Sequence, residues 1–362
     1  MSKLYLHMGF HKTASTSFQE TCRFNLDKLS ELGYLYPLFH LFDNPTTSNH
    51  SMPICSVFAK QQGYRQFFDA KGVLDVNGTI EGYRKYLCEC LSTGKEVILS
   101  GEDISLLEVE ELNLLKAIIE SYSYEIVPLA VVRSPYAYHC SFVQQRIKAG
   151  IHFDLTEFVS QTSKIQNLYK VFDNVIFLSM SDVCKHEQGP VGFLLEFIGL
   201  DSKNFNIYTA NEGVSNEFVR VKNILNQINP LMLNGRLNKD YIGIDELQGE
   251  KFLLTEDEYE IIKNECDSEN KYFLNNLGAN FCDKNIKFSQ SITNKDIADY
   301  FLNEDVGPLP IGYASILRDL ALKIEKDSIV QAYRLMEAAS LLKPEGSFIS
   351  KKLVEYQEVL KK

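Results

Sequence analysis

Nine consecutive residues near the start of the chain combine one lysine with four hydroxyl side chains. The run is Gly9-Phe10-His11-Lys12-Thr13-Ala14-Ser15-Thr16-Ser17, and it separates an apolar stretch from a segment of helical periodicity. At a strand–loop–helix junction of this kind, N–H groups of the loop and the helix point at a bound anion, and the helix dipole favours negative charge. Lys12 adds a mobile positive charge, and the hydroxyl groups add further donors. The run therefore predicts an anion-binding loop. The alternative is a Ser/Thr-rich helix start that binds no ligand.

A second group suited to anions lies further along the chain. Arg133 directly follows the apolar run Glu125–Val132, and Ser141 comes eight residues after Arg133. An arginine side chain presents a rigid fork of donors that matches the geometry of a phosphate, and the start of a following helix adds amide groups. An ordinary salt bridge at Arg133 is the alternative.

Two side chains are candidates for accepting a proton. Glu102 closely follows the apolar run Glu96–Ser100, and His50 lies in the polar segment Ser48-Asn49-His50-Ser51. A carboxylate or an imidazole can act as a general base, and histidine titrates near neutrality. The alternatives are a carboxylate that begins a helix and an ordinary loop histidine.

The elements that must position these residues are four short apolar runs, each followed by a polar turn. They are Lys3–Met8, Glu96–Ser100, Glu125–Val132 and Asn174–Met180, with helical periodicity between them. Near-continuous apolar runs that alternate with helices indicate the buried parallel strands of a doubly wound α/β sheet flanked by helices. Open sheets of this class bind ligands beyond the carboxyl ends of their strands, which is where all four polar turns lie. This shared location favours a ligand site at that edge of the sheet.

Two segments resemble motifs of the sulfotransferases that use 3′-phosphoadenosine-5′-phosphosulfate (PAPS). Residues 7–17, HMGFHKTASTS, resemble the 5′-phosphosulfate-binding loop of that family, roughly H-x-G-x-x-K-T-G-T-T-S, with Ala14 in place of the usual glycine. Residues 131–145, VVRSPYAYHCSFVQQ, resemble the 3′-phosphate motif R-x-P-x-x-x-x-x-S-x-Y-x-Q without its tyrosine. The segment Asn211–Ser215 is similar to a further part of the family. The likeness is to the carbohydrate and bacterial members, and it implies a P-loop-like fold.

The resemblance also implies a reaction. A sulfuryl group would pass in line from PAPS to a hydroxyl of a saccharide, a glycoconjugate or a small metabolite, and PAP (adenosine 3′,5′-bisphosphate) would leave without the help of a metal. Lys12 would stabilise the leaving bridge oxygen. Glu102, in a segment similar to the S-x-E turn of carbohydrate sulfotransferases, is the first candidate base, and His50 is the second because the family uses either residue type. The donor-binding residues would be Gly9, His11, Lys12, Thr13, Ala14, Ser15, Thr16, Ser17, Arg133 and Ser141.

We expect two domains. A sulfotransferase domain would span residues 1–300, in which the aromatic and polar segment 37–85 forms an insertion or lid, or else a surface excursion with small helices of its own. Residues 308–362 would form a small α-helical appendage. Within it, AYRLMEAASLLKPEGSFISKKL resembles a tetratricopeptide helix pair.

Composition excludes several classes of function. The net charge of −11 argues against a general nucleic-acid surface, because proteins that track phosphates carry a basic excess. The seven histidines form no metal-binding pattern, and the spacing of Cys88 and Cys90 matches no structural zinc site. No apolar run approaches the ~20 residues of a membrane span, and the eight scattered cysteines are typical of reduced thiols. A cytoplasmic protein is therefore expected.

Two other functions stay open. A P-loop nucleotide kinase would hold Mg²⁺ with a hydroxyl after the lysine and with an aspartate at a strand end, and Thr13 and Asp103 could serve. The nucleotide P-loop, however, has glycine immediately before the lysine, where this chain has His11. The other possibility is a non-enzymatic interaction protein that uses its helical tail.

Overall fold

The computed structural model describes residues 1–10, 12–41, 44–60, 68, 72–210, 213–233, 236–239, 241, 243, 250–289, 312–326 and 328–361. The chain divides into two compact units. The first comprises Met1–His139, Val159–Glu212 and Cys266–Lys284, and the second comprises Cys140–Phe158, Gly213–Glu265 and Asn285–Lys362. The boundary expected between residues 300 and 308 lies outside the described residues.

The first unit is built on a five-stranded sheet in the order β2-β5-β1-β6-β7. Its strands are β1 (Lys3–His7), β2 (Tyr34–Leu35), β5 (Glu96–Ser100), β6 (Glu125–Val132) and β7 (Ile176–Ser179). All four neighbouring pairs are parallel. The predicted α/β class is therefore confirmed, and each of the four apolar runs contains one of the strands.

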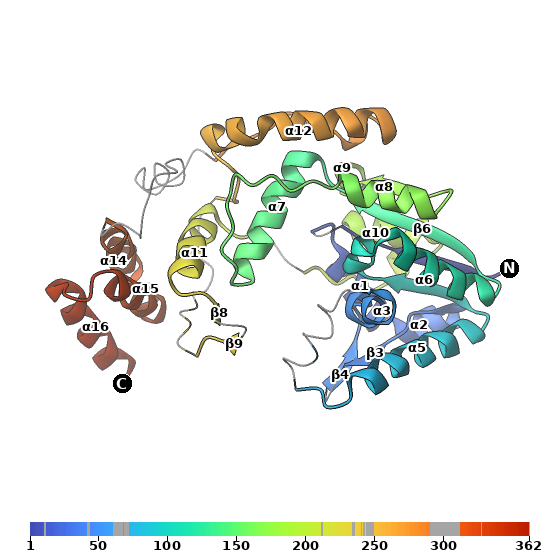
Figure 1. Ribbon diagram of the computed structural model, residues 1–362, viewed down its shortest axis with the longest axis horizontal. Helices are drawn as coiled ribbons and strands as arrows, with labels where there is room; N and C mark the ends of the chain where they lie inside the picture. Colours follow the sequence, from blue (N-terminus) through green and yellow to red (C-terminus); the bar gives the residue numbers. More distant parts are fainter. Residues whose placement is uncertain are drawn as a thin grey trace. The chain divides into compact units, whose positions relative to one another are not determined.

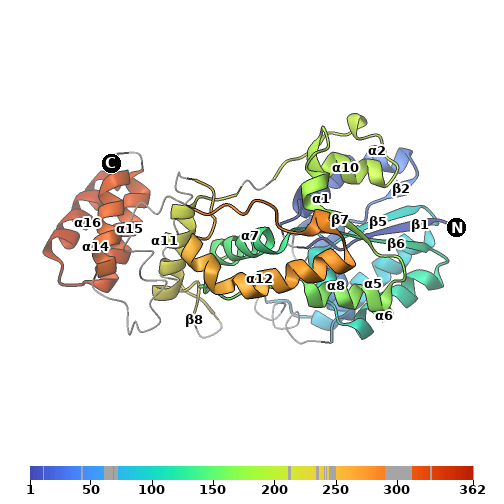
Figure 2. The same ribbon diagram turned by 90° about the horizontal axis from the view of Figure 1, so that it is seen from above.

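Helices cover both faces of this sheet, as a doubly wound fold requires. Figure 2, with the elements labelled as in Figure 1, shows three helices on one face, namely α1 (Ser15–Phe24), α2 (Leu26–Glu31) and α10 (Gly189–Phe197). The opposite face carries α5 (Val76–Ser92), α6 (Val109–Ser121) and α8 (Thr162–Val171). Because both faces are covered, the strands have no solvent side, which explains their unbroken apolar sequences.

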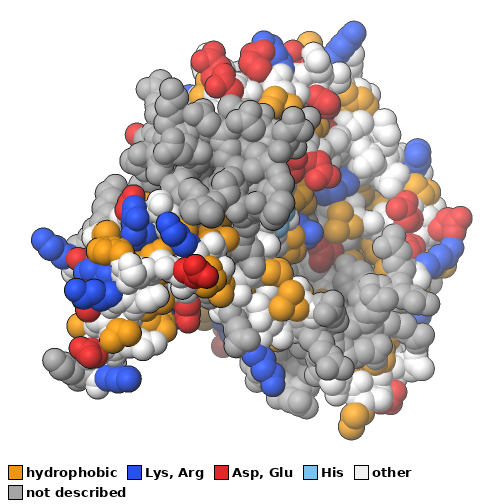
Figure 3. Space-filling view, turned by 60° about the vertical axis from the view of Figure 1, so that its left-hand side comes forward, with side chains coloured by type: hydrophobic (Ala, Val, Ile, Leu, Met, Phe, Trp, Pro, Cys, Tyr) orange, Lys and Arg blue, Asp and Glu red, His pale blue; other side chains and the backbone are white. Residues whose placement is uncertain are grey.

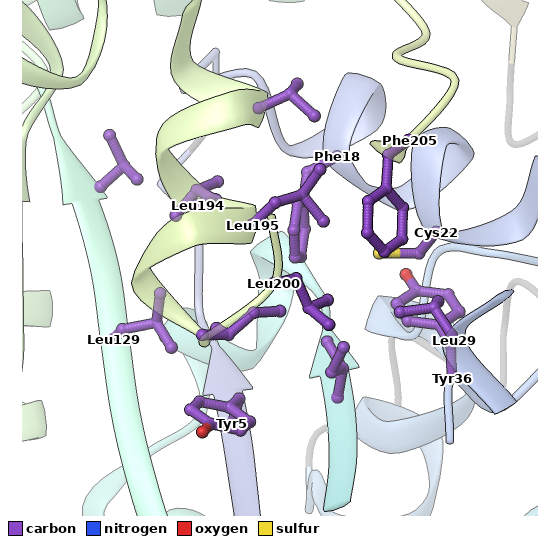
Figure 4. Close-up of a cluster of buried hydrophobic side chains, with 14 of the residues drawn as sticks. Tyr5, Phe18, Cys22, Leu29, Tyr36, Leu129, Leu194, Leu195, Leu200 and Phe205 are labelled. Atoms are coloured by element: carbon purple, nitrogen blue, oxygen red, sulfur yellow. The ribbon is translucent and has the colours of Figure 1, made fainter. Parts of the chain in front are cut away.

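The main core of the first unit lies between the sheet and α1 and α10. Figure 4 shows Tyr5 and Leu129 from the strands facing Leu194 and Leu195 from α10, with Phe18 of α1 beside them. Each of these side chains is at most 8% exposed. Full burial of one such residue contributes about 1.5–3 kcal/mol. This packing holds the start of α1 against the end of β1, which fixes the loop between them.

The segment 37–85, expected as an insertion or a lid, contains regular structure in much of its described part. It forms the antiparallel strands β3 (Phe39–Leu41) and β4 (Asn44–Thr47), the helix α3 (Ser51–Phe58) and the first part of α5. Phe39 is buried, with its ring centroid 5.5 Å from that of His50 and 6.0 Å from that of Tyr83. Phe39 of this hairpin thus packs inside the unit. Residues 42–43, 61–67 and 69–71 lie outside the described part of the segment.

Shorter elements and two longer helices complete the first unit. They are the 3₁₀ turns η1 (Glu102–Leu106), η2 (Ser202–Asn204) and η3 (Ala279–Phe281), the short helix α9 (Met180–Val183), the first residues of α7 (Pro135–Lys148) and the last turns of α12 (Glu256–Asn276).

The second unit is helical. It contains the remainder of α7 and α12, the helix α11 (Asn216–Ile228), the short pair β8 (Met232–Leu233) and β9 (Arg236–Leu237), and three C-terminal helices. Arg220 of α11 forms a buried bidentate ion pair with Glu258 of α12, with N–O distances of 2.6 and 2.8 Å. The helical nature predicted for the tail is confirmed from residue 312 onward, where α14 (Gly312–Ile324), α15 (Ile329–Leu342) and α16 (Ser347–Leu360) pack in succession.

The distribution of surface charge and the character of the helices bear on the classes of function considered above. On the face drawn in Figure 3, Lys and Arg side chains are interspersed with Asp, Glu and hydrophobic side chains, without a continuous basic area among the coloured residues. Among the described residues, none of the helices combines the length and the apolar character needed to cross a bilayer.

Candidate functional site

The loop between β1 and α1 has an uncommon backbone conformation. Lys12 and Ala14 both adopt left-handed geometry, with φ of 65° and 64°. Non-glycine residues adopt this region rarely, at a cost on the order of 1 kcal/mol, and such residues cluster at ligand clamps. Glycine has no such cost, so the geometry accounts for the glycine that the resembling family carries where this chain has Ala14.

Close packing at both ends of the loop keeps it compact. A Cβ at Gly9 would lie 2.2 Å from Ser15 Oγ, so any residue other than glycine would force the Ser15 side chain to move. Thr13 Oγ1 donates a hydrogen bond to the Phe10 carbonyl at 2.5 Å, and Ser17 Oγ accepts one from the Ala210 N–H at 2.9 Å. These two hydroxyls therefore shape the loop, whereas the predicted donor Thr16 is exposed. Ala14 stands at the N-cap of α1 and has no side-chain acceptor for the first helical N–H groups, which suits them to an anion.

Arg133 connects the loop to the second predicted motif. Its Nε–H donates to the Lys12 carbonyl at 2.5 Å, and the Gln161 side chain donates to the Arg133 carbonyl at 3.0 Å. The guanidinium is half-buried, burial lowers the pKa of Arg133, and no carboxylate of the described residues pairs with it. A buried cation without an acidic partner is costly unless a ligand compensates it. Among the residues described, the structure shows no salt bridge of the kind considered as the alternative for Arg133.

The described contacts do not connect Ser141 to the loop as they connect Arg133, and they do not include His11. Ser141 lies in the middle of α7, in the part of that helix that belongs to the second unit, and its role at the donor stays a prediction. His11 lies outside the described residues.

His50, the second candidate base, has a structural position. Its imidazole is fully buried, Nδ1 accepts a hydrogen bond from the Ser100 N–H at 2.9 Å, and Nε2 lies 2.7 Å from the Pro37 carbonyl. Because Nδ1 accepts, Nε2 carries the hydrogen and donates it to Pro37. Burial lowers the pKa of His50 to about 4. Neither nitrogen can take a proton from an acceptor hydroxyl, so the geometry argues against the candidate role and ties β5 to the hairpin segment instead.

His7 is a second buried histidine, and it lies under the loop. Its Nδ1 is 2.8 Å from Ser100 Oγ, which also accepts a hydrogen bond from the Gln19 side chain at 3.2 Å. Its Nε2 is buried, has no hydrogen-bond partner in the described part of the chain, and lies beside Gly9. Burial lowers the pKa of His7 to about 4, and the charge of Glu102 opposes this shift only in part.

Glu102, the first candidate base, begins η1 at the carboxyl end of β5, next to the end of β1 in the sheet. Its side chain is half-buried. Its negative charge acts on three groups of the same unit. Burial lowers the pKa of His7 and of Lys164, and the charge of Glu102 partly opposes both shifts. The pKa of Tyr138 is raised by burial, then by Glu269, and further by Glu102. Glu102 is thus within electrostatic range of the residue that precedes the loop, as the sequence-based placement requires.

Lys164 is a residue that sequence reasoning missed. It lies in the first turn of α8, its Nζ donates to the Tyr138 hydroxyl at 2.9 Å, and it stands 5.6 Å from the centroid of the Phe10 ring. The segment Thr162–Val171 is an ordinary amphipathic helix that carries no motif, so no pattern in the sequence distinguishes Lys164 from the surface lysine Lys170.

The arrangement can bind an extended polyanion and accept a proton beside it. Positive potential comes from the start of α1, Lys12, Arg133 and Lys164, and a carboxylate is supplied by Glu102. No cluster of metal ligands occurs among the residues described. Comparison with known proteins adds nothing to this geometry, since no family model, curated protein or solved structure matches the chain.

Proposed function

We propose that the chain is a PAPS-dependent sulfotransferase that acts on the hydroxyl of a saccharide, a glycoconjugate or another small acceptor. The observation that carries the proposal is the hydrogen bond from Arg133 to the Lys12 carbonyl. It joins the two segments that resemble the 5′-phosphosulfate loop and the 3′-phosphate motif, which lie far apart in the sequence. The two terminal amino groups of the Arg133 guanidinium have no acidic partner within the described chain. They are therefore suited to donate hydrogen bonds to a phosphate.

The residues have separate roles in an in-line displacement. The acceptor oxygen forms a bond to sulfur, while the bond from sulfur to the bridging phosphate oxygen breaks and leaves its electron pair on PAP. Glu102 takes the proton of the acceptor hydroxyl. Lys12 and the N–H groups at the start of α1 stabilise the charge that develops on the leaving phosphate. No step needs a bound metal ion.

The kinase alternative receives less support. Thr13, the hydroxyl that would hold Mg²⁺, donates its hydrogen to the Phe10 carbonyl and is fully buried. A P-loop kinase uses this hydroxyl as a metal ligand. The non-enzymatic alternative predicts no nucleotide affinity, so a binding experiment tests both.

The test is calorimetry with PAP, PAPS, adenosine 5′-phosphosulfate and ATP, the last with and without Mg²⁺. We expect PAP and PAPS to bind. Arg133→Ala should weaken PAP binding by about 1.5–3 kcal/mol, the range for hydrogen bonds to a charged group. Adenosine 5′-phosphosulfate lacks the 3′-phosphate and should lose at most about 1 kcal/mol, through the lost contact with the loop carbonyl.

The matched control is Arg146→Ala, at an exposed arginine in the last turn of α7. It should change neither affinity. Equal losses of the two ligands in Arg133→Ala contradict the assignment of the 3′-phosphate. Tight Mg-dependent ATP binding without PAP binding supports the kinase, and the absence of all nucleotide binding supports the interaction protein. Labelled PAPS with a panel of saccharides then identifies the acceptor.

A further inference from the structure

Lys164 lies in surroundings that differ from those of a surface lysine. Its ammonium is half-buried and stands over two rings, 5.6 Å from the centroid of Phe10 and 5.4 Å from that of Tyr138. Phe10 belongs to the anion-binding loop itself and is fully buried. The ammonium is therefore held against the loop by aromatic faces, which attract a cation without neutralising it.

Three carboxylates influence Lys164, yet none forms an ion pair with it. Burial lowers the pKa of Lys164, and the charges of Asp103, Glu269 and Glu102 oppose that shift. Within the described ranges its one polar contact is the neutral Tyr138 hydroxyl at 2.9 Å. An ammonium has three hydrogens. Two of them consequently remain for a ligand.

Glu269 of α12 holds the start of the helix that carries Lys164. Its Oε1 accepts hydrogen bonds from the N–H groups of Gln161 and Thr162 at 2.7 and 2.9 Å, and from the Ser160 and Thr162 hydroxyls at 2.5 and 2.8 Å. Glu269 thus caps the start of α8, where Lys164 follows. Because Gln161 also bonds to the Arg133 carbonyl, one helix start positions both cations.

We propose that Lys164 is a further catalytic residue, whose ammonium binds the sulfonate oxygens of PAPS. The inference rests on the proposed function and assigns a contact within it. Arg133 is next to Lys12 in the middle of the loop, and Lys164 is over Phe10 near its beginning, in electrostatic range of the base Glu102. In an in-line transfer the sulfonate lies between the leaving phosphate and the acceptor oxygen that the base activates. A cation that lies near both the loop and the base is therefore suited to bind the sulfonate. Lys164 is not consumed, because the proton passes to Glu102 and the electron pair of the broken bond to PAP.

The test compares PAPS with PAP, which differ by the sulfonate. Lys164→Met keeps the length and the apolar stem of the side chain and removes the charge. We expect PAPS affinity to fall roughly 10- to 100-fold, the range for a hydrogen bond to a charged group, with PAP affinity unchanged. Lys164→Arg keeps the positive charge, so it should retain part of the difference in affinity between PAPS and PAP. The control is Lys170→Met, at an exposed lysine of the same helix, which should alter neither ligand.

A second measurement uses the unaltered protein and covers the case in which the variant does not fold. Amine labelling followed by mass spectrometry should show that PAPS protects Lys164 while PAP does not, with Lys170 labelled equally in both. Equal protection by both ligands, or equal affinity losses in Lys164→Met, assigns Lys164 a structural role and overturns the inference while the proposed function stands. If the unaltered chain binds neither PAP nor PAPS, the proposed function fails and the inference fails with it.

Discussion

Removal of the Glu269 carboxylate should destabilise the first unit strongly, because one oxygen caps an entire helix start. In Glu269→Ala four donors lose the Oε1 acceptor, and two of them are backbone N–H groups of Gln161 and Thr162. Gln161 is fully buried, so water cannot replace the carboxylate at its N–H. Loss of a helix cap costs about 0.5–2 kcal/mol, and a buried donor without a partner costs about 1–3 kcal/mol. We therefore expect the free energy of unfolding to fall by about 2–4 kcal/mol.

Urea denaturation followed by circular dichroism measures this loss. Glu265→Ala is the matched control, because Glu265 is exposed on the same helix one turn earlier, and its effect should stay within about 0.5 kcal/mol. PAP affinity of Glu269→Ala should fall as well, since α8 positions Arg133 through Gln161. A loss of stability equal to that of the control would refute the argument that Glu269 holds this helix start.

Three further predictions concern the base and the buried histidines. Glu102→Gln keeps the shape of the side chain but cannot accept a proton, so turnover should fall by ~10²–10⁴-fold with PAP affinity nearly unchanged; near-normal turnover in a steady-state assay would exclude Glu102 as the base. His50→Ala should lower the melting temperature, because it breaks the bonds to Ser100 and Pro37; a stable variant without turnover would instead restore His50 as a candidate base. For His7 and His50 the pKa is about 4 in the folded protein, below the ordinary 6.5 of the unfolded chain. The unfolded chain therefore binds more protons as pH falls from 6.5 to 4, and the free energy of unfolding should drop by up to about 3 kcal/mol per histidine. Urea titrations at a series of pH values measure how steeply the free energy of unfolding depends on pH. His7→Gln should reduce this dependence, and a free energy of unfolding that does not change with pH would contradict the prediction.

The fold class could be predicted because its signal is local. Each strand of a doubly wound sheet is buried on both faces and so has an unbroken apolar sequence, as in Glu125–Val132 and Glu96–Ser100. The same argument placed Glu102 and Arg133 at the ends of β5 and β6. The weakest strand, β2, has two residues and no such signal, and it was not predicted. The hairpin of β3 and β4 was missed as well, because Phe39 of β3 packs against Tyr83, which comes from the more distant α5.

Residue type alone could not separate the functional candidates from structural groups. His50 and Glu102 both follow a pattern that suits a base, yet the bonds to Ser100 and Pro37 occupy both nitrogens of His50. These partners lie 50 and 13 residues away, so no local pattern contains them. The placement of Lys164 likewise depends on Phe10 and Tyr138, which come from two other elements.

The sequence by itself determined the α/β class, the loop of residues 9–17 and the position of Arg133 at a strand end, because periodicity and turn chemistry depend on near neighbours. Only the tertiary structure decided which of these groups meet. It brought the Arg133 guanidinium to the Lys12 carbonyl without an acidic partner in the described chain, and it placed Lys164 over Phe10 under the cap from Glu269. The physical reason is that the burial of a charge, and the presence or absence of a counter-charge, depend on elements that approach only when the sheet and its helices pack.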